Sequence, residues 1–576
     1  MLKYVFLLIG IGSFAQVGIN TNDPKGSLHI ESINNMGLVL PRVSNLDLVT
    51  DGQGGPPEEG TMIFNTSIPA TCFYQNSKWV CIEEDASGNP IFVDQVSCTT
   101  TATYIKASNT DSQDSFSRVL SVSNDGLTLA VGATGDDSNA SGINGNQSNN
   151  SLLNSGVVYI FSKVSGNWVQ QAYIKASNPG AQDFFAISLS LSGDGNTLAV
   201  GAIGEDSNAI GINGNQFNNS SQDSGAVYVF HRSGSNWSQQ AYIKSSNSQT
   251  LDFFGRDVSL SYNGDVLAVG ADGEDSNATG INGSQSNNSA QGAGAVYIFN
   301  RNGSSWSQTT YIKASNPNVV DQFGDYLDID DAGTTLLVGA ANEDSSAVGI
   351  NGNQADNSAL SSGAAYVFYH NGSGWAQEAY LKASNTEAND QFGFGVSVSG
   401  NGNVVAIGAT GEDSDTTTIN GDQFNNGAVD SGAIYIFTRT VGVWSQEAYV
   451  KSSNSNQYDD LGYSLALSYD GTTLLTGTYG EDGDGIGLCA TDNNNANRAG
   501  AAYLFKKQGG EWSEKLYIKA TNSEVVDEFG FSCDMTPNGS TMVIGAHNEG
   551  SNAIGINGDQ TNNLSPASGA VYVFEN

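Results

Sequence analysis

The strongest constraint on the fold is a sequence motif that recurs every 69 residues, or 68 at the last step, over most of the chain. The segment "YIKASN", or a close variant of it, begins at Tyr104, Tyr173, Tyr242, Tyr311, Tyr380, Tyr449 and Tyr517. Two further markers keep the same register: an Asp-x-Phe-Gly motif that first occurs at Asp114, and a "VGA" motif within "AVGAT" at 130–134. Three markers in one register predict a chain built of seven similar structural units.

The pattern inside each repeat is that of β-strands. In "FAISLSLSGDGNTLAVGA", Phe185, Ile187 and Leu189 alternate with small or polar residues, and "GDGNT" supplies a tight turn into a second strand. A long polar loop leads to a third strand, "SGAVYVF", and a short turn leads to a fourth, "WSQQAYIKAS". Four antiparallel strands in each of seven repeats predict an all-β, seven-bladed β-propeller. The alternative, a β-solenoid, has coils much shorter than this repeat.

The two ends of the repeat region are complementary. The first copy begins at "TATYIKASN" with no third strand before it, and the last copy ends with a third strand at Val571–Phe574 and no fourth. We therefore expect the leftover strand, about residues 101–108, to pair with 571–574 and complete the last blade. This pairing would close the ring and leave no unpaired strand edge.

The chain is predicted to have three parts: a signal peptide at 1–15, a β-rich leader module at 16–98, and the propeller at 99–576. The first part, "MLKYVFLLIGIGSFAQ", has one lysine, an apolar run and small residues before a cleavage point after Ala15. A buried N-terminal strand is the alternative. No later apolar run approaches the roughly 18 residues that span a bilayer. We expect a protein that is exported and located outside the cell, secreted or held at the surface.

The cysteine pattern predicts one disulfide bond. In "CFYQNSKWVC", Cys72 and Cys81 are symmetric about Asn76-Ser77, so that a two-residue hairpin turn would set them opposite each other as a close pair. Export makes a bond between them plausible, and two free thiols are the alternative. The other three cysteines, Cys98, Cys489 and Cys533, lack zinc-ligand spacing and a nearby histidine.

The charge balance is strongly acidic. There are 59 acidic and 21 basic residues, a formal net charge of −38, which argues against nucleic acid and anionic lipid as partners and favours cations. One third of the basic residues are the lysines of the repeated segment: Lys106, Lys175, Lys244, Lys313, Lys382, Lys451 and Lys519. Because the fourth strand is the outer edge of a blade, we interpret them as guards against edge-to-edge aggregation. A basic ligand-binding ring is the alternative.

The Asp-x-Phe-Gly and "VGA" markers resemble the FG-GAP repeat, the unit of integrin α-subunit propellers and of many secreted bacterial proteins. The resemblance covers residues 101–576. It implies a propeller that contacts its ligand through one loop face, and a calcium ion often held in the turn between the first two strands. Here that turn reads "SGDGNT" or "SGNGNV", which has too few carboxylates for a calcium site. Calcium is therefore not expected in that turn.

A different loop, between the second and third strands, is rich in oxygen donors. In the second repeat it reads "GEDSNAIGINGNQFNNSSQDSGA". Side-chain oxygens are the ligands that Ca²⁺ prefers. The candidate ligands are Glu205, Asp206, Asn208, Asn213, Asn215, Glu274, Asp275, Asn277, Glu343, Asp344, Glu412 and Asp413. The alternative is that these side chains bond their own backbone in Asx-turns.

The predicted function is binding. The long loops should share a face with the connections from each fourth strand to the next blade, and long loops on a rigid scaffold are where binding usually resides. The four histidines, His29, His231, His370 and His547, fall at unrelated repeat positions, and no G-x-S-x-G or H-E-x-x-H motif occurs. We predict a non-catalytic propeller that binds protein or glycan, as in adhesion. The alternatives are a structural surface or matrix component without a ligand, and an enzyme that acts on polysaccharides.

Residues 16–98 resemble a leader module found at the start of many exported bacterial surface proteins and, more loosely, in fibre proteins. The segments that carry this resemblance begin "VGINTNDPKGSLHIES" and "GLVLPRVSNLDLVTDGQGGPPEEG". The module has few apolar strands for a core of its own, so we expect it to need a partner chain.

Overall fold

The computed structural model describes residues 17–19, 28–30, 40–43, 46, 49, 57, 61–65, 70–75, 78–84, 90–94, 102–490 and 493–575. The chain divides into two compact units, Met1–Ser97 and Cys98–Asn576. The signal peptide expected at 1–15 falls outside the described residues. No helix in the described part of the chain is long and apolar enough to cross a membrane.

The first unit is a small β structure. One parallel pair of strands and one five-stranded sheet make it up: β1 (Val17–Ile19) and β2 (Leu28–Ile30), then β3 (Arg42–Val43), β4 (Met62–Asn65), β5 (Ala70–Gln75), β6 (Lys78–Glu84) and β7 (Pro90–Asp94). In the β5–β6 hairpin Cys72 lies opposite Cys81, and the two are joined in a disulfide. The described residues of this unit bury one apolar cluster, Ile63, Ala70, Cys72, Trp79 and Cys81, which is small for an independent domain.

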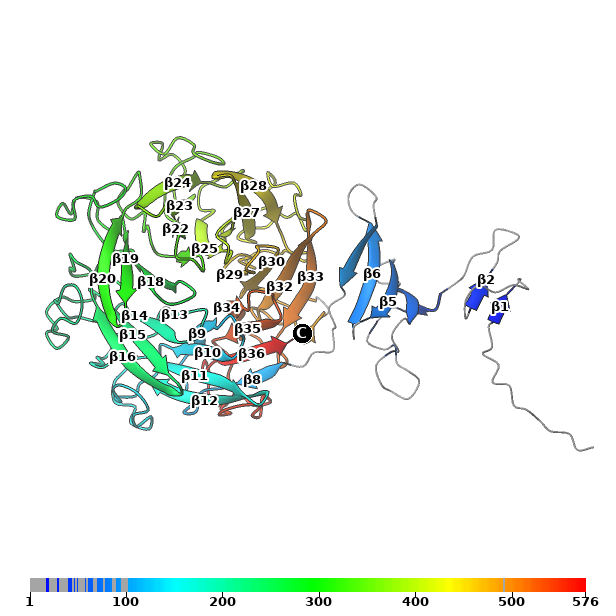
Figure 1. Ribbon diagram of the computed structural model, residues 1–576, viewed down its shortest axis with the longest axis horizontal. Coiled ribbons are helices and arrows are strands. Elements are labelled where there is room, and N and C mark those ends of the chain that lie inside the picture. Colours follow the sequence, from blue (N-terminus) through cyan, green and yellow to red (C-terminus); the bar gives the residue numbers. More distant parts are fainter. Residues whose placement is uncertain are drawn as a thin grey trace, which may run out of the picture. The chain divides into compact units, whose positions relative to one another are not determined.

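The described residues of the second unit form seven sheets arranged in a ring (Figure 1). The first four blades are β9 (Phe116–Val122), β10 (Thr128–Ala133), β11 (Val157–Val164), β12 (Asn167–Ile174); β13 (Leu189–Leu191), β14 (Thr197–Ala202), β15 (Ala226–Ser233), β16 (Asn236–Ile243); β17 (Val258–Leu260), β18 (Val266–Ala271), β19 (Ala295–Asn302), β20 (Ser305–Ile312); and β21 (Leu327–Ile329), β22 (Thr335–Ala340), β23 (Ala364–His370), β24 (Trp375–Leu381). The last three are β25 (Phe392–Val398), β26 (Val404–Ala409), β27 (Ala433–Thr440), β28 (Val443–Val450); β29 (Ser464–Leu467), β30 (Thr473–Thr478), β31 (Gly487–Leu488), β32 (Ala501–Gln508), β33 (Glu511–Lys519); and β34 (Phe529–Met535), β35 (Thr541–Ala546), β36 (Ala570–Glu575), with β8 (Thr103–Ile105).

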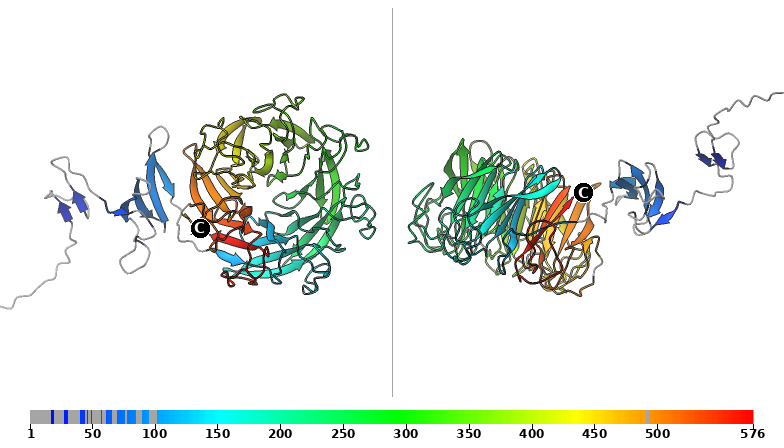
Figure 2. Two further views of the ribbon diagram at one scale, coloured as in Figure 1. Left: turned by 180° about the vertical axis from the view of Figure 1, so that it is seen from behind. Right: turned by 90° about the horizontal axis from the view of Figure 1, so that it is seen from below.

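In each blade the first strand lies nearest the axis of the ring and the fourth lies at the rim (Figures 1 and 2). Neighbouring strands pair antiparallel, for example β14 with β15 from Thr197–His231 to Ala202–Ala226. The second strands, such as "TLAVGA" at 197–202, are buried along their length except at Val266, because the faces of both adjacent blades cover them. The blade pattern is therefore the one that the sequence period predicts.

The last blade is closed by the start of the propeller, as the sequence predicts. Strand β8 pairs antiparallel with β36, with Ile105 opposite Val571 and Tyr104 opposite Tyr572. In Figure 1 the light-blue β8 lies beside the red β36, although their residues are more than 460 positions apart. The paired segment, Thr103–Ile105, is shorter than the expected 101–108. The pairing leaves β36 without a free edge.

Apolar cores lie between adjacent blades. One cluster joins Val158 and Ile160 of the first blade to Phe185, Leu189 and Tyr228 of the second. Phe185 is the phenylalanine of the Asp-x-Phe-Gly position, and its ring centroid lies 5.4 Å from that of Tyr228. Its backbone passes so close to the preceding blade that a Cβ on Gly156 would lie 1.9 Å from the Phe185 carbonyl oxygen. The "SG" before each third strand is thus explained by the close approach of the next blade.

A β-bulge in the outer strand pair positions a side chain that contacts the next blade at four places in the ring. The register between β11 and β12 shifts after Ile160, which leaves Gln171 without a partner in β11. The side chain of Gln171 instead accepts a hydrogen bond of 2.8 Å from the indole Nε1 of Trp237 in the next blade. The same contact joins Trp306 to Gln240 and Trp444 to Glu378. The regularly spaced tryptophans therefore fasten the rim of the ring.

Candidate functional site

The seven long loops between the second and third strands are anchored by buried ion pairs. Each lysine of the "YIKASN" segment reaches a carboxylate at the start of the loop in its own sheet, at Nζ–oxygen distances of 2.5 to 3.2 Å. The pairs are Lys106–Glu549, Lys175–Asp136, Lys244–Glu205, Lys313–Glu274, Lys382–Glu343, Lys451–Glu412 and Lys519–Glu481. All seven lysine side chains are 0% exposed, so the interpretation of these lysines as exposed edge guards is wrong.

The carboxylate of Glu274 shows how fully these acids are satisfied. Its Oε2 accepts hydrogen bonds from Lys313 Nζ at 2.8 Å and from the backbone N–H of Ser276 at 3.1 Å. Its Oε1 accepts from Asn247 Nδ2 at 2.8 Å and from the Tyr311 hydroxyl at 2.9 Å. Burial lowers the pKa of Lys313, and the adjacent Glu274 opposes that shift. A buried charge pair is tolerated here because nearly every lone pair and proton has a partner.

The asparagine of "YIKASN" carries the network into the next blade. In all seven connections its Nδ2 donates to the anchoring carboxylate of the following blade, as Asn247 does to Glu274 and Asn316 does to Glu343. Its Oδ1 accepts from a third-strand tyrosine of that blade, as from the Tyr297 hydroxyl at 2.6 Å. One four-residue segment therefore holds the acid of its own blade with lysine and that of the next with asparagine. The result is a ring of buried polar contacts through all seven blades.

The second acid of each loop ties the loop to its own far end. Asp206, Asp275, Asp344 and Asp413 each accept, through Oδ1, the backbone N–H of a residue 17 positions later, at 2.8 to 2.9 Å. Asn213 accepts the N–H of Tyr242 in the outer strand at 3.0 Å, and Asn215 accepts the N–H of Phe217 at 3.2 Å. Asn208 and Asn277 are exposed, and their backbone N–H groups donate across the loop to Asn218 and Asn287. Of these contacts, the Asn215–Phe217 bond, two residues apart, is an Asx-turn as the alternative describes, whereas the aspartates join parts of the loop 17 residues apart.

The candidate calcium ligands are therefore engaged in holding the loops. Glu205, Glu274, Glu343 and Glu412 face lysines, and the following aspartates face backbone N–H groups. Within the described residues, no group of three or more His, Cys, Asp or Glu side chains is arranged to hold a metal ion. Calcium binding by these loops stays a prediction, for which a titration is given below.

Beyond their anchors the loops expose apolar side chains. The largest exposed fractions belong to Phe217 at 75%, Leu564 at 74%, Phe424 at 70%, Leu360 at 64% and Ile486 at 63%. The loops occupy residues 134–156, 203–225, 272–294, 341–363, 410–432, 479–500 and 547–569, between the strands given above. They extend at the periphery of the ring in Figure 1. Exposed aromatic and aliphatic groups on anchored loops form a surface suited to contact with a partner.

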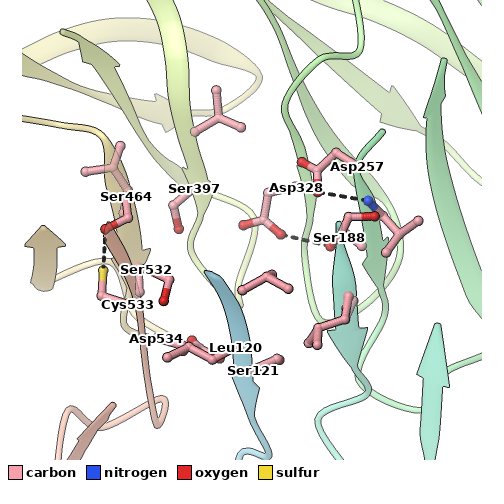
Figure 3. Close-up of a pocket in the computed structure, with 18 of the residues that line it drawn as sticks. Leu120, Ser121, Ser188, Asp257, Asp328, Ser397, Ser464, Ser532, Cys533 and Asp534 are labelled. Atoms are coloured by element: carbon pink, nitrogen blue, oxygen red, sulfur yellow. Dashed lines mark hydrogen bonds between the residues drawn. The ribbon is translucent and has the colours of Figure 1, made fainter. Parts of the chain in front are cut away.

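The axis of the ring holds a cavity of about 400 Å³, lined by the first strands of all seven blades. Side chains at one repeated position bridge adjacent first strands: Ser190 Oγ accepts the N–H of Leu260, and Asp328 Oδ2 accepts that of Val398. Three aspartates, Asp257, Asp328 and Asp534, lie along this wall (Figure 3). Burial raises the pKa of Asp257 to about 7 and the pKa values of Asp328 and Asp534 to about 6. The cavity wall is thus polar, and its acids hold the blades together.

The mouth of this cavity on the loop face differs in side chains from one repeat to the next. The residue directly after each Asp-x-Phe-Gly position lies there, one from each blade: Arg118, Ile187, Arg256, Asp325, Phe394, Tyr463 and Phe531. Rings of successive blades are in contact, with centroid distances of 5.1 Å for Phe394–Tyr463 and 4.8 Å for Tyr463–Phe531. Arg256 Nε donates to Asp325 Oδ1 at 2.5 Å. We call these seven residues the mouth ring.

Charged groups of the last blades surround one side of the mouth ring. Glu528 pairs with Arg498 at 2.6 Å and lies 3.3 Å from Nε2 of His547. Burial, with two arginines nearby, lowers the pKa of His547 to about 3, so its imidazole is neutral at neutral pH. Arg118 stacks over Phe531, with its Cζ 5.4 Å from the ring centroid, and forms no ion pair with any described residue. The mouth therefore offers one uncompensated arginine among aromatic rings.

Sequence reasoning missed the mouth ring because the residue after Asp-x-Phe-Gly takes five types in seven copies and belongs to no repeated motif. The next position, from Val119 to Ser532, also takes five types, so variability alone does not single out the mouth. His547 lies at this mouth, beside Phe531.

The sheet order and the closing strand define the second unit as a seven-bladed β-propeller. Residues 168–230, 237–299 and 375–437 match the family described as FG-GAP repeat. These three segments are therefore similar to FG-GAP repeats, as the sequence markers indicate. Residues 18–100 match a different family, described as a phage tail like trimerisation region. None of the curated proteins matches the chain.

Solved β-propellers share the general architecture at low identity. The β-propeller domain of Cps50 (Swd1) from Myceliophteria thermophila is 9% identical, covering 82% of this chain and 99% of that one, with a TM-score of 0.42. The WD40 repeats of RRP9 are 8% identical, covering 83% and 98%, with a TM-score of 0.42. A candidate 6-phosphogluconolactonase from Bacteroides uniformis is 13% identical, covering 71% and 89%, with a TM-score of 0.39. These scores are too low to carry a conclusion.

Proposed function

We propose that this protein is an exported, non-catalytic binding propeller that engages a protein or a glycan through its long loops. The observation that carries the proposal is the set of large apolar side chains that the anchored loops expose, led by Phe217 and Phe424. The loop fold does not require phenylalanine there, because Ser148 and Ser286 occupy the same place in the first and third repeats. Exposed phenylalanines at selected loops support recognition of a partner rather than hydration alone.

The anchoring network favours this role because it limits the entropy lost on binding. The loops are held at their start by a buried lysine, at their end by an aspartate, and at their middle by a bridge such as Ile212–Ile243. A binding surface that is already ordered keeps more of its contact energy as affinity.

The test uses the serines that other repeats carry. Phe217→Ser and Phe424→Ser together should abolish binding to the oligosaccharide or displayed peptide that the wild type selects from an array and a phage library. Val441→Ser removes a side chain that is 97% exposed in a short turn of the opposite face, and it should leave binding unchanged. A wild-type protein that selects nothing would favour the alternative of a structural surface or matrix component. Turnover of a polysaccharide that stops on loss of one carboxylate would favour the enzyme.

Calcium is tested separately by thermal melting. A rise in melting temperature on addition of millimolar Ca²⁺, absent with the Asp206→Asn and Asp275→Asn variants, would establish a loop site. No shift would leave the Asx-turn alternative, in which the same oxygens hold only the backbone. Mg²⁺ at equal concentration serves as the control for general charge screening on a chain of net charge −38.

We infer further that the first unit joins three chains. The match of residues 18–100 to a trimerisation region supports this, as does the small apolar cluster that the described residues of the unit bury. Three propellers on one stem would bind a repetitive surface with an avidity above that of one propeller. Light scattering of the full chain should give three times the mass of one chain, and a monomer at micromolar concentration would contradict the inference.

A further inference from the structure

A second hollow lies on the propeller face opposite the long loops. It has a volume of about 640 Å³ and is formed by the turns between the first and second strands of blades three to six and by the ends of two third strands. Tyr262, Asp331, Tyr369, Arg439 and Tyr469 are among the residues that line it. We call it the turn-face hollow. Its volume lies in the range of small-ligand sites.

Exposed aromatic rings are concentrated in this hollow. Six aromatic side chains of the described residues are strongly exposed, and three of them line it: Tyr262 at 46%, Tyr369 at 37% and Tyr469 at 50%. The other three are Phe217, Phe424 and Tyr458. Three partly exposed tyrosine rings around a single hollow offer an amphipathic surface on which a ligand can stack.

The turns hold two of these rings in place. The repeated position that carries Tyr262 and Tyr469 carries Gly193 and Gly400 in the preceding blades. The Cδ2 atoms of the two tyrosines lie 2.4 and 2.5 Å from where a Cβ on those glycines would be. Each ring therefore fits only because the neighbouring residue is a glycine without a side chain. The carbonyl of Tyr262 also accepts the N–H of Asp194, at 3.0 Å. The tyrosines are therefore positioned before any ligand arrives.

Planar polar groups lie beside the rings. Arg439 stacks on Tyr369 with its Cζ 4.9 Å from the ring centroid, and its orientation is set by Glu378, at 2.9 Å. Asp331 Oδ2 accepts from Asn124 Nδ2 of the first blade at 3.3 Å. The Nδ2 of Asn401 and the hydroxyls of Tyr262 and Tyr469 donate to no acceptor among the described residues. These groups remain available to hydrogen-bond a ligand.

We propose that the turn-face hollow binds a neutral sugar ring of a glycan. The flat C–H faces of a sugar stack on tyrosine rings, while its hydroxyls pair with amide, carboxylate and guanidinium groups. A net charge of −38 disfavours acidic glycans and nucleic acids. The site is independent of the loop face, so the chain would hold its loop-face partner and a glycan on opposite faces.

The test is an array of neutral, amino and acidic oligosaccharides, followed by calorimetric titration of the tightest neutral sugar. Tyr262→Ala and Tyr469→Ala should each weaken the binding of that sugar about tenfold. Tyr262→Phe and Tyr469→Phe should retain most of the affinity. Tyr458→Ala, an equally exposed tyrosine outside the hollow, and the Phe217→Ser/Phe424→Ser pair should leave the affinity unchanged.

Several outcomes would overturn the proposal. They are a wild type that binds no neutral sugar on the array, binding lost only in the loop-face pair, and wild-type affinity in both alanine variants. Selection of a displayed peptide by the hollow in place of a sugar would overturn it as well. Melting curves verify that each variant is folded, and Asn401→Ala, which changes a turn side chain without touching either ring, provides a second test if an alanine variant unfolds.

Discussion

The seven lysines of the "YIKASN" segment and the seven residues of the mouth ring are equally regular in position but differ in sequence. The lysines are identical in every blade, buried, and paired with a carboxylate. The mouth ring takes five residue types, from Arg118 to Phe531, and surrounds an open cavity. Where the propeller fold needs the same contact in all seven blades, the same side chain recurs. Where the fold needs no particular contact, the side chain can vary and is available to bind a ligand. Substitutions in the two sets should therefore differ in their effect on stability.

The largest effect is expected where the repeated set closes the ring. A chain that starts at Thr110 lacks β8, Lys106 and Asn109, which leaves Glu549 buried without its lysine and β36 with a free edge. Compared with a chain that starts at Cys98, its free energy of unfolding should fall by more than about 5 kcal/mol in urea denaturation. Equal stability of the two chains would contradict the closing role of β8.

A single buried lysine should matter nearly as much. Lys244→Met leaves Glu205 buried and uncompensated, and it should cost about 3–5 kcal/mol of unfolding free energy. The matched control is Lys163→Met, whose partner Glu575 is exposed, with an expected cost of about 0–1 kcal/mol. The double variant Lys244→Met/Glu205→Gln should recover part of the loss. A cost for Lys244→Met no greater than for the control would show that the buried pair is unimportant.

The aspartates of the Asp-x-Phe-Gly motif should make stability depend on pH. Burial raises the pKa of Asp252 to about 7, and the same holds for Asp183 and Asp321. Because the folded pKa lies above the unfolded one, the stabilisation is complete below about pH 4 and is lost as pH rises through 7. The melting temperature should be higher at pH 5 than at pH 8. Asp252→Asn should reduce that difference, and the exposed Asp356→Asn should not change it.

The smallest effect is expected at the mouth ring. Arg118→Gln removes a stacked guanidinium that forms no ion pair, and it should change the free energy of unfolding by less than about 1 kcal/mol. Urea denaturation of this variant beside Lys244→Met compares the two sets directly. If Arg118→Gln lowered the free energy of unfolding as much as Lys244→Met does, the distinction between the repeated and the variable positions would be wrong.

Much of the fold could be predicted because its signals are local and repeated. Alternation of apolar residues in "AVYVF" sets the strands, and the incomplete first and last copies specify that β8 must join β36. The candidate site was harder, because the role of a polar side chain depends on what lies opposite it. Lys244 and Glu205 are 39 residues apart, and nothing in their spacing reveals that they meet in a buried pair.

The sequence by itself determined the number of blades, the position of the closing strand and the face that carries the long loops, because each follows from periodicity and strand alternation. Only the tertiary structure decided which polar groups are buried. It placed the acids of the loops against lysine and backbone N–H groups, and it gathered Tyr262 and Tyr469, 207 residues apart, around one hollow. Desolvation and partner geometry depend on contacts between blades, and those contacts exist only once the ring has closed.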